Sequence, residues 1–380
     1  MGLEIERVET RSQLSQFIKV AWTVYANDRH WAPPLFFERL HFLDKNKNPF
    51  FQHAEADYFI ARRDGRPVGT IAAILNHRHN ACQQENGAHF GMFELLDDPE
   101  TAALLLETAC DWARQRGTDK IIGPMNLSTN DECGMLLEGF GRPPVIMMTY
   151  NPPYYLDFMA ANGFHKAMDL LAWESEISST NEQELMPSKL LRVVEKVRQK
   201  HKVTIRPVNM RTWDEEVGRL RTIYNQAWQR NWGFVPMTEA EIQQLADSLK
   251  SILDPALVFV AEVAGQPVGF GLTVPDVNQL LCEIRPGPSL LSSYLGAARL
   301  LWGKRRAKGI RVIALGVVEA YRQRGVDALL YYETAKAAAQ RGYTWAEASW
   351  ILETNDAMNR PLALMGMRVY KKYRLFEKQL

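Results

Sequence analysis

The residues whose types and spacing best suit chemistry lie where a strand-like run meets a helical pattern. Val312-Ile-Ala-Leu-Gly-Val-Val precedes Glu-Ala-Tyr-Arg322-Gln-Arg324-Gly325, and a helical pattern follows from Val-Asp327-Ala-Leu. A loop that opens a helix presents unpaired backbone amides at the positive end of the helix dipole, and such amides bind anions. The two arginines add positive charge, whereas Asp327 would repel an anion unless it points outward as an ordinary first-turn acid. The segment predicts an anion site.

A second candidate is a carboxylate on a strand-like run near the C-terminus. Glu347 alternates with Trp345 and Ser349 on one face of Tyr343-Thr-Trp-Ala-Glu-Ala-Ser-Trp, so it could accept a proton in a cleft. A structural acid bonded to the sheet edge explains the position equally well. Tyr370 and Tyr373 are candidate proton donors, although tyrosines on a final strand are more often packing residues.

An aromatic segment follows the first helix of the second half of the chain. Its rings could line an apolar pocket and its amides could orient a polar head group, whereas the alternative is a helix end packed by tryptophans. The candidate substrate-binding residues are Asn225, Trp228, Asn231, Trp232 and Phe234.

Length and composition describe an ordinary globular protein with two cores. The 380 residues exceed the usual size of one core, and 46% hydrophobic with 23% charged residues excludes disorder. A net charge of +1 gives no general attraction to nucleic acid. No apolar run approaches the roughly 20 residues of a membrane span, and no signal peptide is recognisable, so we expect a cytoplasmic protein. The scattered cysteines and His77-x-His79 predict no metal site.

An internal repeat positions these residues. Two segments 200 residues apart are similar: Ala61-Arg-Arg-Asp-Gly-Arg-Pro-Val-Gly69 and Ala261-Glu-Val-Ala-Gly-Gln-Pro-Val-Gly269. Each segment lies between two strand-like runs, which predicts the same hairpin twice. A helical pattern, a strand and a short helix follow each hairpin. We expect units at 1–174 and 203–380, joined by a polar linker and helix at 175–202, with an insertion at 282–309 in the second unit. Each unit is predicted to be a mixed, mostly antiparallel sheet flanked by helices, an α/β architecture.

The order of elements and the loop resemble the acetyltransferase superfamily known as GNAT. In that family an Arg/Gln-x-x-Gly-x-Gly/Ala loop holds the diphosphate of coenzyme A, and here Arg322 and Gly325 match while Asp327 does not. The resemblance implies that acyl-CoA is the co-substrate, without a metal or a permanently bound cofactor. It also implies coenzyme contacts, including backbone amides near the thioester, from Val317, Val318, Arg322, Gln323, Arg324, Gly325, Val326, Ala328 and Asn355. A second departure is Leu362, where many members have a tyrosine that protonates the leaving thiolate.

The whole chain is similar to a bacterial group of long GNAT-related proteins, related to the bacterial ceramide synthases that acylate a sphingoid base. Gly123-Pro-Met-Asn126-Leu-Ser-Thr-Asn130-Asp-Glu-Cys-Gly134 carries the likeness in the first unit, and we expect this loop to face the other unit. The first unit has Phe93-Glu-Leu-Leu-Asp-Asp-Pro-Glu100 where a diphosphate would bind, so it is predicted to bind no coenzyme.

These features predict an N-acyltransferase that moves an acyl group from acyl-CoA to a primary amine, with a long acyl chain or a lipid-like amine. The insertion supports this, because residues 290–308 are apolar with a basic end and could lie on the inner membrane surface; the alternative is a helix packed on its own domain. A catalytically inactive binding or scaffold protein and a small-amine acetyltransferase stay open as alternatives. Peptide-bond formation from aminoacyl-tRNA is disfavoured by the near-neutral charge.

Overall fold

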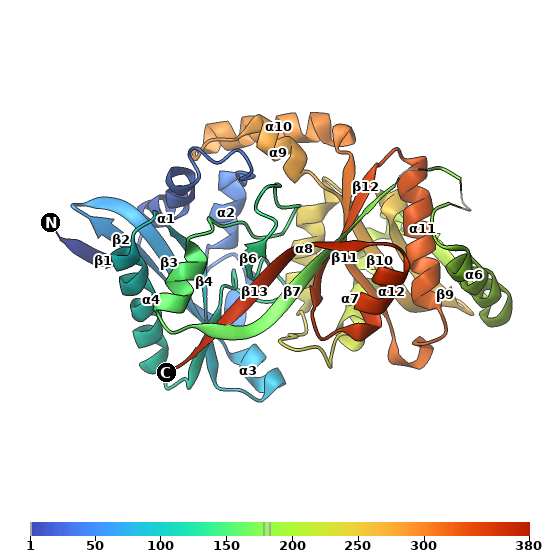
Figure 1. The fold of residues 1–380 in the computed structure, drawn as a ribbon, viewed down its shortest axis with the longest axis horizontal. Coiled ribbons are helices and arrows are strands. Elements are labelled where there is room, and N and C mark those ends of the chain that lie inside the picture. The colour runs from blue at the N-terminus through green and yellow to red at the C-terminus, as the bar shows by residue number, and fades with distance from the viewer. Residues whose placement is uncertain (1, 178, 182–183) are drawn as a thin grey trace.

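A single continuous sheet runs through the computed structural model, which describes residues 2–177, 179–181 and 184–380 (Figure 1). The strand order is β1-β2-β3-β4-β5-β13-β7-β12-β11-β10-β9-β8, and β6 pairs with β13. The strands of the N-terminal half of the chain are β1 (Leu3–Arg7), β2 (Ala54–Arg63), β3 (Arg66–Asn76), β4 (Gly87–Leu95), β5 (Lys120–Gly123), β6 (Met135–Glu138) and β7 (His165–Glu176). Those of the C-terminal half are β8 (Val203–Pro207), β9 (Val258–Val263), β10 (Gln266–Pro275), β11 (Gly309–Val317), β12 (Trp345–Leu352) and β13 (Arg368–Gln379).

Helices cover both faces of this sheet, which confirms the predicted α/β class. In the N-terminal half they are α1 (Arg11–Val24), α2 (Phe36–Phe42), α3 (His77–Gln83), α4 (Pro99–Arg114) and α5 (Tyr155–Ala161). In the C-terminal half they are α6 (Ser188–His201), α7 (Trp213–Ala227), α8 (Glu239–Lys250), α9 (Asn278–Ile284), α10 (Leu290–Gly303), α11 (Val326–Gln340) and α12 (Asp356–Leu364). Alternate residues of β3 enter different cores: Ile71 and Ala73 pack with α4, whereas Ala72 and Ile74 pack with α1.

The repeated hairpin is present in both halves. Arg63 pairs with Arg66 across the first turn, and Val263 pairs with Gln266 across the second. The turn glycines have φ of +77° at Gly65 and +78° at Gly265, a conformation that a side chain disfavours. The predicted repeat is thus confirmed down to the turn geometry.

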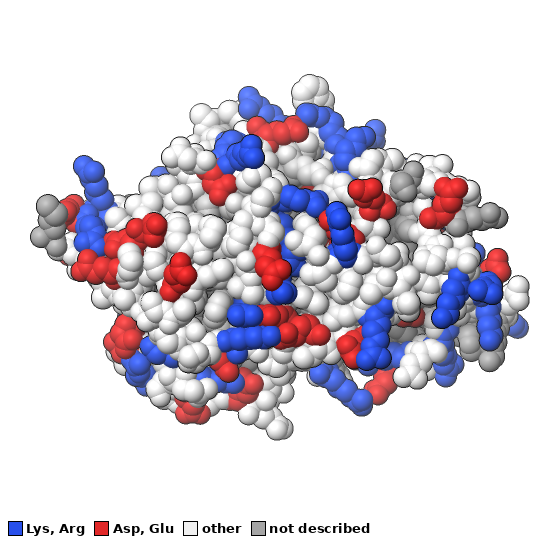
Figure 2. All heavy atoms as spheres, in the orientation of Figure 1, with Lys and Arg blue, Asp and Glu red and all other residues white. Residues whose placement is uncertain are grey.

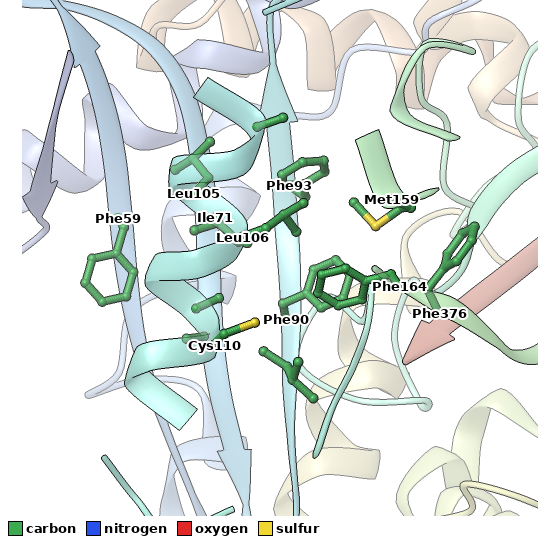
Figure 3. Close-up of a cluster of buried hydrophobic side chains, with 14 of the residues drawn as sticks. Phe59, Ile71, Phe90, Phe93, Leu105, Leu106, Cys110, Met159, Phe164 and Phe376 are labelled. Carbon is green, nitrogen blue, oxygen red and sulfur yellow. The ribbon is translucent and has the colours of Figure 1, made fainter. Parts of the chain in front are cut away.

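The two halves exchange their last strands. β13, from the end of the chain, pairs antiparallel with β5 and β7, while β7 pairs antiparallel with β12. Figure 1 shows β13 crossing beside β7 at the centre of the molecule. Phe376 of β13 joins the core of the N-terminal half with Phe90, Phe164 and Met159 (Figure 3). The predicted units 1–174 and 203–380 therefore each contribute a strand to the other's part of the sheet.

The predicted linker 175–202 falls in part outside the described residues, at 178, 182 and 183. Its helix, α6, packs against α11, where Arg198 pairs with Glu333. The predicted insertion 282–309 contains the end of α9 and all of α10, which packs on α9 and α2.

Candidate active site

A cavity opens where two parallel strands of the C-terminal half separate. β11 and β12 pair from Gly309 with Trp345 to Val312 with Ala348, and the pairing ends there. Beyond that point Ile313–Leu315 and Ser349–Leu352 line a cavity of about 190 Å³. The separation leaves an apolar slot in the sheet with unpaired strand edges on two sides, the kind of concave site that binds small molecules.

The predicted aromatic segment forms one wall of this cavity. Trp228, Asn231, Trp232 and Phe234 line it, and the Trp228 ring lies over Gly316 of β11, where an added Cβ would come within 2.4 Å of the ring. The Asn225 side chain lies elsewhere: its amide exchanges hydrogen bonds of 3.1 and 3.2 Å with the backbone of Met237. Four of the five predicted substrate residues thus meet at the cavity, and Asn225 fixes the loop that carries them.

The predicted anion loop begins α11 with free amides. Gly325 has φ of +79° and caps the helix without a side-chain hydrogen bond. The amides of Val326, Asp327 and Ala328 donate to no group among the described residues. An added Cβ at Gly325 would lie 2.6 Å from Val197 of α6, so only glycine fits this close approach.

The charged and apolar residues of the loop are partly engaged within the protein. The Arg322 guanidinium donates to the backbone carbonyls of Val317 and Ala227, which joins the loop to the end of α7. The Arg324 guanidinium lies 4.9 Å from the centre of the Tyr321 ring, and Gln323 has a positive φ of 59°. The Val318 amide donates to Val268 O at 2.9 Å, so it is not free to hold a thioester. Asn355, at the start of α12, lines the cavity.

The equivalent gap in the N-terminal half is filled by the chain itself. β4 and β5 pair in parallel only as far as His89 with Ile122. Met125 then donates its amide to Phe90 O at 2.7 Å, and an added Cβ at Gly91 would come within 1.9 Å of Met125 O. The first amides of α4 are capped by Asp98. This half therefore offers neither an open slot nor free helix amides at the positions used in the other half.

Glu347 lies buried beside the cavity but does not line it. Its carboxylate accepts hydrogen bonds from the hydroxyls of Ser349 and Tyr370. Ser349 does line the cavity, and its Oγ accepts a 3.0 Å hydrogen bond from Arg311 Nε. Glu347 can therefore reach a bound molecule only through the Ser349 hydroxyl, and its catalytic role stays a prediction.

The two predicted proton donors, Tyr370 and Tyr373, do not line this cavity either. Burial, with the nearby charge of Glu347, raises the pKa of Tyr370 and of Tyr373 above the ordinary tyrosine value. The Tyr373 hydroxyl is buried and has no hydrogen-bond partner among the described residues. Their surroundings are those of packing residues between the two halves, and a direct role in acyl transfer is likewise untested.

A second, larger cavity of about 1400 Å³ lies between the N-terminal half and helices α8 and α10. Apolar side chains such as Phe17, Trp22 and Leu301 line much of it. It shares several lining residues with the smaller cavity, so the two spaces adjoin: Asn130, Asp131, Met147, Met237, Leu245 and Leu249.

The boundary between the cavities is formed by the predicted interdomain loop, which does face the other half. Thr129 donates to Gly233 O at 2.7 Å, and Asn130 donates to Val235 O at 3.0 Å. The Tyr224 hydroxyl in turn donates to Asn130 Oδ1 at 2.7 Å. These bonds fix the loop of the N-terminal half against the aromatic wall of the smaller cavity.

Carboxylates gather on this boundary and on the adjoining wall of the larger cavity. Burial raises the pKa of Asp131 to about 7, although its carboxylate accepts a 2.8 Å hydrogen bond from Ser128. Burial likewise raises the pKa of Glu94 to about 7, despite hydrogen bonds from Tyr25 and Tyr155. Glu132 is half-buried, and burial would raise its pKa, but the ion pair with Arg39 and a hydrogen bond from Asn126 together outweigh burial and lower the pKa.

Sequence reasoning did not single out several of these groups. Asp131 was visible only as part of a polar loop in the half predicted to bind no coenzyme. Tyr331 of α11 lines the smaller cavity, donates to Met358 Sδ at 3.5 Å and packs in the same apolar cluster as Leu362. Its helical spacing from Gly325 was the available signal, but a tyrosine on a helix face also suits a core.

Comparisons with known proteins find relatives that match this chain over nearly its full length. No model of a known protein family matches the chain. The chain is 37% identical over 377 residues to Protein YghO of Escherichia coli (strain K12), covering 97% of this chain and 94% of that protein. It is 36% identical over 393 residues to the Bacterial ceramide synthase of Caulobacter vibrioides, covering 100% of this chain and 98% of that protein.

Solved structures share the fold at much lower identity. A tandem GNAT protein from the clavulanic acid biosynthesis pathway matches with a TM-score of 0.58 at 11% identity, covering 100% of this chain and 98% of that one. A GCN5-related N-acetyltransferase from Sphaerobacter thermophilus matches with a TM-score of 0.51 at 13% identity, covering 99% and 95%. The tandem GNAT fold is therefore confirmed.

Proposed function

Since the chain belongs to the family of these two bacterial proteins and has a tandem GNAT fold, we propose that it is an acyl-CoA-dependent N-acyltransferase. The acceptor is the primary amine of a lipid-like base such as a sphingoid base. The Caulobacter relative is named a ceramide synthase, which supports this choice of acceptor.

The observation that carries the proposal is the pair of adjoining cavities. The small one lies between separated strands and is lined by Tyr331 of α11, the helix whose first amides are free, which suits a thioester whose coenzyme runs along this helix toward its start. The large one is lined over much of its wall by apolar side chains and ends at half-buried carboxylates, which suits a long hydrocarbon chain with a cationic head. An acyl donor and an amine that occupy them would meet at the loop that contains Asn130 and Asp131.

Proton transfer is assigned to groups that face these cavities. An alkylammonium must lose a proton before its nitrogen can attack, and Asp131, with a pKa of about 7, is ionised often enough near neutrality to accept it. The amine nitrogen then bonds to the thioester carbon, the carbon–sulfur bond breaks, and the sulfur leaves with the electron pair. The nitrogen releases its second proton as the amide forms, and the thiolate takes up one proton to become the free thiol. The Tyr331 hydroxyl donates to that sulfur, in place of the tyrosine that many GNAT enzymes have where this chain has Leu362.

Coenzyme binding is assigned to the α11 loop. The amides of Val326, Asp327 and Ala328 are directed by the helix start toward an anion, and Arg324 and Gln323 add donors at its rim. Arg322 acts through its hydrogen bonds to Val317 and Ala227, which hold the loop against α7. Asn355 lines the thioester cavity and could donate there.

Glu347 is assigned a positioning role. It holds Ser349, which also accepts from Arg311, and Arg311 further donates to Ser349 O at 3.1 Å and Ile146 O at 2.6 Å. The network fixes the cavity side of β12 and connects it to the N-terminal half. A relay from the amine through the Ser349 hydroxyl to Glu347 is the competing route for the proton.

Two other functions remain to be distinguished. Asp327, Leu362 and the engaged Val318 amide favour a binding protein without catalysis, whereas the volume of the larger cavity argues against an acetyltransferase for small amines.

The test compares palmitoyl-CoA with acetyl-CoA as donors to sphinganine, below micelle-forming concentrations, by following thiol release. We expect a kcat/KM at least tenfold higher for palmitoyl-CoA, because each buried methylene favours binding by about 0.8 kcal/mol. A preference for acetyl-CoA would identify a small-amine acetyltransferase. Calorimetric binding of acyl-CoA without turnover would identify a binding protein, and no binding by a folded protein would overturn both readings.

A further inference from the structure

Helix α10 exposes most of its large apolar residues and buries several small ones. Leu291 is 73% exposed, Leu295 is 55% exposed and Trp302 is 92% exposed. Their spacing of four and seven residues puts them on one face of the helix. Isolated apolar residues on a surface need no explanation, but a stripe of three large ones along a helix marks a contact surface.

The opposite face of α10 fixes the helix on the protein. Ser293, Gly296, Leu300 and Gly303 are buried, and the Ser293 hydroxyl accepts a 3.3 Å hydrogen bond from Phe37 N. An added Cβ at Gly296 would lie 2.9 Å from Pro286. The small residues allow close packing of this face against the protein. That packing fixes the orientation of α10, and the large apolar residues therefore point to solvent.

Basic side chains flank the exposed stripe. Arg299, Arg305 and Lys308 are exposed and form no ion pair with any described residue. Arg306, by contrast, pairs with Glu283 at 2.8 Å. Figure 2 shows white and blue atoms, with a red patch between them, along the upper edge, where Figure 1 places α10 and α9. Apolar residues next to unpaired cations complement an anionic lipid surface.

The exposed stripe continues directly into the larger cavity. Leu290, Tyr294, Ala297 and Leu301 form the neighbouring stripe of the same helix, and all four line that cavity. Tyr294 is 59% exposed and stacks on Phe37 of α2, with 4.9 Å between ring centres. One side of α10 thus faces solvent while the adjacent side borders the space proposed for the amine substrate.

We propose that α10 docks the protein on an anionic lipid bilayer, with Leu291, Leu295 and Trp302 in the interfacial layer and Arg299, Arg305 and Lys308 among the lipid head groups. This orientation brings the α10 wall of the larger cavity to the bilayer surface, so a lipid-like substrate can pass along Leu290, Tyr294 and Leu301 without crossing water. The passage of substrate rests on the proposed function. Docking itself does not, because it requires no acyl transfer.

The test is sedimentation of the full chain with vesicles of phosphatidylcholine alone and of phosphatidylcholine with an equal part of phosphatidylglycerol. We expect binding to the anionic vesicles that weakens with salt, and a fall of about tenfold or more in the partition coefficient for the triple variant L291S/L295S/W302S. Because these side chains are exposed, the variant should fold normally. Leu364→Ser, at a 62% exposed leucine on α12, is the matched control and should bind like the unmodified chain.

Two results would overturn the proposal. One is equal binding of the triple variant and the control, or no binding of the unmodified chain to anionic vesicles. The other is a concentration-dependent dimer in sedimentation velocity that the triple variant dissolves, since this would assign the stripe to a second copy of the chain. A variant that loses vesicle binding but keeps activity toward a water-soluble short-chain amine would separate docking from catalysis.

Discussion

The proposed proton transfer depends on Asp131, because Asp131 lines both the smaller and the larger cavity. Replacing Asp131 with Asn keeps the shape but removes the base, and kcat should fall by roughly 10²-fold or more. In the unmodified enzyme kcat should rise with pH through about 7, since only the ionised carboxylate accepts a proton, and that limb should vanish in D131N. The measurement is the pH profile of kcat for both proteins.

Glu347→Gln supplies the comparison for this profile. If Glu347 only positions Ser349, E347Q lowers kcat but keeps the limb near pH 7. Loss of the limb in E347Q, with the limb retained in D131N, would move the base to Glu347 acting through Ser349.

Tyr331 is the residue proposed to assist the leaving sulfur. Tyr331→Phe removes only the hydroxyl, and we expect kcat to fall by about 10- to 100-fold with little change in KM. The deficit should shrink with an acyl thioester whose thiol is more acidic, because a better leaving group needs less assistance. Tyr332→Phe, on the neighbouring position of α11, is the control, and an equal loss in both variants would point to a structural effect.

Asp327 lies among the amides proposed to bind the coenzyme diphosphate. Asp327→Asn removes a negative charge from an anion site, so the Kd for acyl-CoA should fall several-fold, and the gain should diminish at high salt. Isothermal titration measures it directly. Asp214→Asn, at an exposed first-turn acid of α7, should leave Kd unchanged. Weaker binding in D327N would show that the carboxylate supports the loop rather than repelling the ligand.

At the scale of elements, local sequence patterns predicted the hairpins and the helices, because turn residues and apolar spacing determine these elements locally. Gly65 and Gly265 identified both hairpins, and the apolar spacing of α4 and α11 identified the helices that cover them. The exchange of β7 and β13 could not be read this way, because alternation along a strand records which face is buried and not which strand lies beside it.

The site was predictable to the same extent. Trp228, Trp232 and Phe234 were found because aromatic residues near a helix end are conspicuous, and they line the smaller cavity. Asp131 was not, because its importance depends on hydrogen bonds from Thr129 and Asn130 to a loop about a hundred residues away, which the sequence does not reveal.

The exchanged strand makes a prediction about cooperativity. Phe376 belongs to β13 but packs in the core of the N-terminal half, so Phe376→Ala should lower the free energy of unfolding by about 3–5 kcal/mol. Because β13 also pairs with β7, both halves should still unfold together in one urea transition. The control is the exposed Leu364→Ala, expected to change stability by about 0.5 kcal/mol or less. Two separate transitions in F376A would show that the halves fold independently.

At the scale of the whole molecule, the contact between the halves contains buried ionisable groups rather than an apolar layer alone. Asp276 of the C-terminal half accepts a 3.0 Å hydrogen bond from Ile146 N, and Lys371 donates to the carbonyls of Arg142 and Pro143 at 2.8 Å. Burial lowers the pKa of Lys371 to about 8 and raises that of Asp276 to about 7. The same contact joins the halves and borders the cavities, so the ionisation of Asp276 and Lys371 affects stability as well as function.

Among the described residues, no helix is long and apolar enough to cross a bilayer.

These groups predict how stability depends on pH. Asp131, Glu94 and Asp276 have folded-state pKa values of about 7 because of burial, against about 4 in an unfolded chain. Between these values the folded protein holds protons that the unfolded chain has released, so the free energy of unfolding falls as pH rises. Burial lowers the pKa of His79 and His89, which makes stability rise with pH below about 6.5, so the carboxylates dominate only above that pH. Burial also lowers the pKa of Lys371 to about 8, and this one group opposes the three carboxylates between about pH 6.5 and 8. From about pH 6.5 to 8 we expect the free energy of unfolding to fall by a net amount on the order of 1 kcal/mol.

Urea unfolding at the two pH values measures this loss of stability. The variant Asp276→Asn, which keeps an acceptor for Ile146 N, should reduce the loss. An unchanged difference in D276N would mean that Asp276 is already ionised at about pH 6.5 and that its buried charge is stabilised by its two backbone amide donors and by Arg311.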